Sequence, residues 1–128
     1  MKFETFKILQ NLDEKIDEGI PITIFKGYRA INKRGVEKLI DELYANLPND
    51  VKKAREYLKN KNIELNTKPS NLYDNISNLE SSLNQGFHIA KYVIINIQEL
   101  EQLLDKIYAS IPNEIVAAKN IEKNIDNM

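Results

Sequence analysis

The feature that most constrains the fold of this 128-residue chain is an internal repeat. At a constant separation of 64 residues, 13 of the 33 positions in 28–60 are identical to those in 92–124, far more than unrelated segments share. Upstream, apolar and glycine positions match at a separation of 67: Leu9, Leu12, Ile16 and Gly19 with Ile76, Leu79, Leu83 and Gly86. We interpret the chain as a tandem duplication, with repeat one at 1–60, a polar linker at 61–70 and repeat two at 71–128.

Each repeat is expected to form a helix, a hairpin and two further helices. Apolar residues at helical spacing run from Phe6 to Ile16 and from Leu72 to Leu83, and both runs end at a glycine typical of a helix C-terminus. Two β-prone runs, 20–25 and 28–31, then flank Lys26-Gly27, a pair suited to a two-residue turn. The equivalent 87–95 segment is shorter, so its hairpin must be tighter or reduced to one strand.

The second helix of each repeat has a start signal and a stop signal. Asn32 and Asn96 stand where an N-cap is needed, and Pro48 and Pro112 predict a corner before the third helix. The fold class is therefore mainly α with short β-hairpins (α+β), a tandem pseudo-two-fold repeat. Because a unit of about 60 residues buries little core alone, we expect one joint core. The second-helix stripes are expected to be buried between the two repeats at the centre of that core; they are Leu39, Ile40, Leu43, Leu103, Leu104 and Ile107.

Composition argues against an enzyme. The chain has no cysteine and one histidine, His88, and none of its four glycines belongs to a phosphate-binding loop. Acidic neighbours lie on solvated helix faces rather than in a cleft. We predict no catalytic residues, no metal and no cofactor.

Two groups of residues are candidates for binding. The first is an interaction tip on the first hairpin, Phe25, Lys26, Tyr28 and Arg29, because aromatic and arginine side chains dominate contact energies. The alternative is that Phe25 and Tyr28 only flank the turn and cover the second helix.

The second group is a partner face on the last helix, Val116, Ala117 and Asn120. Repeat one has Lys52 and Lys53 where repeat two has Val116 and Ala117, so the apolar face of the last helix is wider. That helix is expected to pack on two sides, in the core or against a partner. The loss of these lysines and the net charge of −1 argue against nucleic-acid binding.

A longer pattern resembles a group of small bacterial helical proteins. It runs from Ile20-Pro21-Ile22-Thr23 through the hairpin to residues 37–54, EKLIDELYANLPNDVKKA, with a Leu-Pro-x-acidic-Ile/Val-x-x-Ala corner. It covers Leu9 to Ala54 and again Ile76 to Ala118, and it resembles proteins described as DivIVA-like or V-type ATPase stalk-like. The DivIVA resemblance implies a polar or septal scaffold that touches membranes through an aromatic and an arginine, here Phe25 and Arg29. This chain differs in having two copies and no long coiled-coil tail, which argues against filaments.

We therefore expect a non-enzymatic protein-interaction or scaffold module, membrane- or division-site-associated. The alternative is an accessory stalk or regulatory subunit of a larger assembly. Charged residues interrupt the apolar stretches near the N-terminus, and no apolar run approaches the roughly 20 residues of a membrane-crossing helix. The expected location is cytoplasmic, with peripheral contact at the inner membrane. The expected partner is an unidentified protein, and the chain is a monomer or homodimer.

Overall fold

The computed structural model describes residues 2–65 and 70–126 and is mainly helical with two short hairpins, which confirms the expected mainly-α class with short β-hairpins. The elements in chain order are α1 (Glu4–Asp17), β1 (Ile20–Pro21), β2 (Tyr28–Asn32), α2 (Lys33–Asn60), α3 (Leu72–Gln85), β3 (Phe87–Ile89), β4 (Tyr92–Asn96), α4 (Ile97–Ala109) and α5 (Asn113–Asp126). The predicted 61–70 linker falls between α2 and α3, and its residues 66–69 lie outside the described residues.

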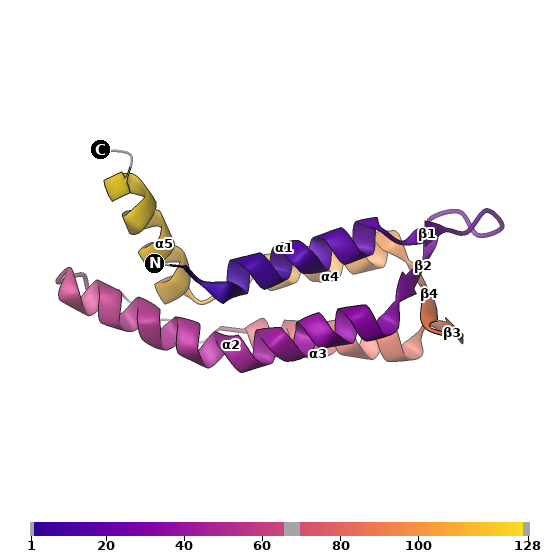
Figure 1. The fold of residues 1–128 in the computed structure, drawn as a ribbon, viewed down its shortest axis with the longest axis horizontal. Coiled ribbons are helices and arrows are strands. Elements are labelled where there is room, and N and C mark those ends of the chain that lie inside the picture. Colours follow the sequence, from indigo (N-terminus) through magenta and orange to yellow (C-terminus); the bar gives the residue numbers. More distant parts are fainter. Residues whose placement is uncertain (1, 66–69, 127–128) are drawn as a thin grey trace.

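The first four helices form an elongated bundle (Figure 1). α1 packs on α2 and α3 packs on α4, and contacts of α1 with α4 and of α2 with α3 close the ring. A small sheet closes one end of the bundle, and α5 lies against α2 at the other end (Figure 1).

The sheet is antiparallel with the strand order β1-β2-β4-β3. Its central pair has the register Tyr28↔Asn96 to Asn32↔Tyr92. Beyond the strands, Lys33 N donates to Lys91 O at 3.2 Å, and Ile97 N donates to Gly27 O at 2.8 Å. These contacts join equivalent positions of the two expected repeats, as a two-fold axis between β2 and β4 would require. The duplication itself stays a prediction from the sequence.

Both expected N-caps are confirmed. The Asn32 side chain accepts from Gly35 N, and the Asn96 side chain accepts from Glu99 N, each at 3.1 Å. These bonds satisfy backbone donors that the first turn of a helix leaves unpaired. Each central strand therefore passes directly into the helix that follows it.

The predicted corner is wrong at Pro48, which lies inside the continuous α2. A proline removes one backbone hydrogen bond, but α2 is held on both sides of it, by α1 and by α5. At Pro112 the chain does leave the helix, and α5 begins at Asn113. There Ser110 Oγ contacts Lys106 O at 2.8 Å and Asn75 Nδ2 donates to the same carbonyl at 3.2 Å, so α3 and Ser110 satisfy the end of α4.

The two hairpins differ in length. β1 pairs only through Ile20↔Ala30 and Pro21↔Arg29, and residues 22–27 form a loop that ends at Gly27, with φ of 84°. The predicted turn at Lys26-Gly27 is present, because Tyr28 N donates to Phe25 O at 3.1 Å across it. It does not close a two-residue hairpin, since the strand pairing stops at Pro21↔Arg29. The second hairpin is tight, as one of the two expected forms, because only residues 90–91 join β3 to β4.

The core is one apolar cluster that draws on both halves of the chain. Of the six residues expected at its centre, Leu39, Ile40, Leu43, Leu104 and Ile107 are buried, while Leu103 is half-buried. Each second-helix stripe packs mainly on the first helix of its own repeat, since α2 lies on α1 and α4 on α3. The expectation that the stripes meet chiefly between the repeats needs that correction.

Two tyrosines link the first helix of one expected repeat to the second helix of the other. Tyr108 OH on α4 donates to Asp13 Oδ2 on α1 at 3.1 Å. Tyr44 on α2 faces Glu80 on α3 in the matching arrangement. Desolvation, followed by these carboxylates, raises the pKa of each phenol from 10.0 to about 12.

A buried carboxylate fixes the start of α1. Asp50 Oδ2 accepts from Thr5 N at 2.8 Å and from Thr5 Oγ1 at 2.6 Å, and both residues are buried. The carboxylate compensates for Phe3, the N-cap residue, which provides no side-chain hydrogen bond. The middle of α2 thereby anchors the N-terminus of α1.

Candidate interaction surface

The outward face of the sheet is apolar and uncovered within the described chain. Along β2 and β4, Ile31, Val93 and Ile95 point into the bundle and are buried. The alternate positions, including Tyr28 and Ile94, therefore lie on the opposite face. This is the reverse of the usual antiparallel arrangement, in which the face away from the core is polar.

The edge strand β3 extends the same face. Phe87 pairs with Ile94 and Ile89 pairs with Tyr92, so both side chains point outward. Phe87 is 67% exposed and Ile89 51% exposed. Large apolar side chains gathered at one place on a surface mark an interaction site more often than scattered ones do.

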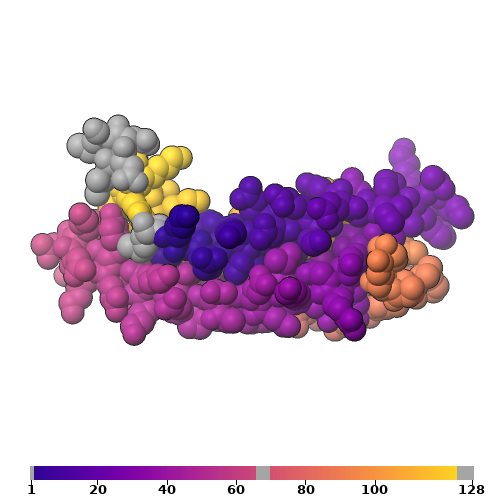
Figure 2. Space-filling view, in the orientation of Figure 1, coloured from indigo at the N-terminus to yellow at the C-terminus, as the bar shows by residue number. Residues whose placement is uncertain are grey.

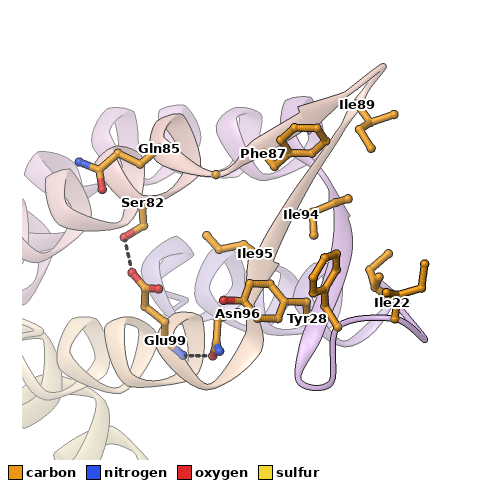
Figure 3. Close-up of a pocket in the computed structure, with 13 residues that line it drawn as sticks. Ile22, Tyr28, Ser82, Gln85, Phe87, Ile89, Ile94, Ile95, Asn96 and Glu99 are labelled. Carbon is orange, nitrogen blue, oxygen red and sulfur yellow. Dashed lines mark hydrogen bonds between the residues drawn. The ribbon is translucent and has the colours of Figure 1, made fainter.

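A groove of about 790 Å³ runs over this face (Figure 3). The 22–27 loop and Tyr28 form one wall and β3 forms the other, with Ile94 between them. Figure 2 shows the two walls as neighbouring projections at one end of the molecule, the loop in purple and the β3 hairpin in orange. The apolar residues that line the groove are Ile22, Ile24, Phe25, Tyr28, Phe87, Ile89, Ile94 and Ile95.

Polar groups gather at one end of the groove, at the C-terminus of α3 and the N-terminus of α4. Ser82 Oγ donates to Glu99 Oε1 at 3.3 Å, and Asn96 holds the backbone N–H of Glu99 (Figure 3). A carboxylate in the first turn of a helix is favoured by the helix dipole. Among the residues that line the groove, Glu99 is the one with a charged side chain.

The loop wall is present in only one of the two hairpins. Tyr28 lies nine positions after Gly19, whereas Tyr92 lies six positions after Gly86. The extra length contains Ile24, which is 84% exposed, and Phe25, which is 59% exposed. Exposed apolar residues in a lengthened loop add little to the stability of the core, so binding is the better explanation for them.

The four predicted tip residues do not form one cluster. The rings of Phe25 and Tyr28 meet edge to face, with centroids 6.1 Å apart, and both line the groove. Lys26 is exposed beside them on the loop. Arg29 lies on the opposite face because neighbours along a strand alternate, and its Nη1 donates to Ile16 O at 3.4 Å, at the end of α1.

The predicted partner face lies at the other end of the molecule, on α5 (Figure 1). Val116 and Ala117 are half-buried and pack against the core, while Asn120 is exposed. Most of the widened apolar face therefore packs within the chain.

Sequence reasoning missed the second wall of the groove and its polar end. Phe87, Ile89 and Glu99 belong to the site, although none was singled out. The signal was the run Val93-Ile94-Ile95, which is apolar on both faces of a strand. A strand at the end of a bundle with two apolar faces needs a cover on each.

The described residues hold neither an evident metal site nor a membrane span. In 2–65 and 70–126, no three His, Cys, Asp or Glu side chains gather as metal ligands, and His88 is exposed on β3. No helix in these ranges combines the length and apolarity needed to cross a bilayer.

No protein-family model, no curated protein and no solved structure matches the chain, so its own geometry carries the functional argument.

Proposed function

We propose that this protein is a non-enzymatic interaction module that binds a protein partner in the groove on the outward face of its sheet. The observation that carries the proposal is the apolar sheet face that no element of the described chain covers. It combines aromatic anchors, Phe25, Tyr28 and Phe87, with one charged group, Glu99.

The composition of the groove supports a protein partner. Removing an exposed Ile or Phe side chain from water contributes about 1.5–3 kcal/mol, so a few such residues suffice for a specific contact. The polar end at Ser82 and Glu99 can then orient the partner through hydrogen bonds.

The test is affinity capture from the source cells with the full chain. The double variant Phe87→Ser plus Ile89→Ser removes one apolar wall at exposed positions, so the fold is retained. Partners held by the groove should be depleted at least about tenfold on this variant, which corresponds to about 1.4 kcal/mol.

The matched control is Lys52→Glu on α2, an exposed position remote from the sheet. It should recover the same partners as the wild type. Equal recovery by the groove variant and the wild type would contradict the proposal.

A second candidate function is peripheral contact with an anionic membrane. It is favoured by the 22–27 loop, where exposed Ile24 and Phe25 stand next to Lys26. It would place the protein on the cytoplasmic side of the inner membrane, as the DivIVA resemblance implies. Co-sedimentation with phosphatidylserine vesicles tests it: Phe25→Ala should lose binding, and absence of wild-type binding would exclude it.

A further inference from the structure

We propose that the groove is filled by the 22–27 loop of a second copy, so that two chains form a symmetric dimer by exchanging loop contacts. This inference rests on the proposed function, because it names the occupant of that same groove. Its support comes from the placement of the loop, its charge and its apolar side chains.

The loop and the groove lie side by side at the same end of the central strands. The loop adjoins the Asn96 end, since Gly27 O accepts from Ile97 N at 2.8 Å. The β3 side of the groove reaches the same end, where Asn96 and Glu99 line it (Figure 3). The loop follows β1 on one side of the sheet, and the β3 wall lies on the other.

This placement suits one kind of two-fold axis. Consider two sheets that face each other across a two-fold axis parallel to β2 and β4. The Asn96 end of one sheet then lies over the Asn96 end of the other, and the β1 side of each sheet lies over the β3 side of the other. The loop of one copy then lies over the β3 side of the groove of the other. The same contact forms twice, as in any closed isologous dimer.

The charges of the loop and the groove are complementary. Lys26 is the one charged residue in 22–27, and Glu99 is the one charged residue that lines the groove. Within the residues that the structure describes, neither side chain makes an ion pair. In the dimer, each Lys26 ammonium would approach the Glu99 carboxylate of the other copy at the polar end of the groove.

The apolar side chains match as well. Ile24 and Phe25 protrude from the loop, and Phe87 and Ile89 form the wall that would receive them. The 22–27 loop is longer than its counterpart in the second hairpin. The same loop therefore provides the side chains that enter the groove of the other copy and one wall of the groove in its own chain.

The test is sedimentation velocity on the purified full chain over a range of concentrations. The variants are Lys26→Glu, Glu99→Lys, the combination of both, and Lys52→Glu as a charge-matched control away from the sheet. Circular dichroism checks that each variant is folded. We expect the wild type to dimerise and each single reversal at Lys26 or Glu99 to weaken the dimer about tenfold, because each creates two like-charge contacts.

The double variant restores both pairs with reversed sign, so it should dimerise within about twofold to threefold of the wild type, as should Lys52→Glu. Three results would each overturn the inference: a wild type that stays monomeric, single reversals without effect, or a double variant as weak as the singles.

The result is separable from the proposed function. A monomeric wild type that still loses a cellular partner in the Phe87→Ser plus Ile89→Ser variant assigns the groove to a different protein. That outcome overturns the dimer and leaves the interaction function standing.

Discussion

Gly86 is needed for a different reason from the one that its position in the sequence suggests. Its position suggests a helix C-terminal glycine, a role that commonly uses a left-handed backbone. Its φ is −68°, which any residue can adopt. The requirement is close packing, because a Cβ at Gly86 would lie 2.4 Å from Val93 Cγ2 and 3.2 Å from Ile94 O.

Gly86→Ala is therefore expected to destabilise the protein by about 2–3 kcal/mol, since β4 or α3 must move to admit the methyl group. Urea unfolding followed by circular dichroism measures the change. Gly35→Ala in α2 is the control: its new Cβ would meet its nearest neighbour at 3.6 Å, and it should stabilise the helix by about 0.5–1 kcal/mol. Equal effects at the two glycines would contradict the packing argument.

Other single-residue features could not be predicted from local sequence. Asp50 reads as one of several acidic residues on a helix, yet it is 1% exposed and binds Thr5. Arg29 reads as part of a binding tip, yet it donates to the end of α1. In both cases the partner is distant in the chain, and only the fold brings the two together.

At the scale of elements, two equivalent prolines have different outcomes. Pro48 lies inside the continuous α2, and Pro112 lies in the link between α4 and α5. The residues next to them differ, since Ser110 ends α4 where Asn46 continues α2 with a bond from its Nδ2 to Glu42 O at 2.7 Å. Neighbouring packing thus overrides the local preference of proline to end a helix.

Replacement of these prolines should have effects of opposite sign. Pro48→Ala restores a backbone N–H inside a helix and should stabilise the protein by about 1–3 kcal/mol. Pro112→Ala raises the conformational entropy of the unfolded chain without completing a helix. It should therefore destabilise the protein by about 0.5–1 kcal/mol. Thermal and urea unfolding of both variants measure the difference. Stabilisation by Pro112→Ala with none by Pro48→Ala would contradict a continuous helix at Pro48 and a break at Pro112.

The elements most predictable from the sequence are those with local signals. Helical periodicity and the Asn32 and Asn96 caps set the starts of α2 and α4 correctly. The first hairpin was less predictable, because Lys26-Gly27 fits a two-residue turn although the strand pairing ends at Pro21↔Arg29. Register depends on the partner strand, which the local sequence does not identify.

At the scale of the whole molecule, the two expected repeats are held together by related contacts. Tyr108 donates to Asp13 and Tyr44 faces Glu80, so each second helix reaches the first helix of the other expected repeat. In both contacts the carboxylate favours a protonated phenol.

These tyrosines predict a loss of stability in alkali. Because folding raises their pKa from 10.0 to about 12, their contribution is complete below pH 10 and is lost as the pH rises through 12. The double variant Tyr44→Phe plus Tyr108→Phe should therefore lose less stability than the wild type over this range. Urea unfolding at a series of pH values tests this, and parallel pH profiles for the two proteins would contradict it.

The groove is a property of the whole molecule, which explains why the sequence predicted only part of it. Phe25 and Tyr28 were identifiable as an aromatic pair on one hairpin. Their counterparts on β3 become neighbours only because β2 pairs with β4 in the centre of the sheet. No spacing within either repeat carries that information.

The unbroken α2 also sets the separation between the two ends of the molecule. Its 28 residues correspond to about 42 Å of helix, which begins at the sheet and reaches the α5 end. Anything bound at the sheet is thereby held at a set distance from anything bound near α5. In a pair of chains joined sheet to sheet, the two α5 ends would point in opposite directions, and the distance between them would be about twice the length of one chain.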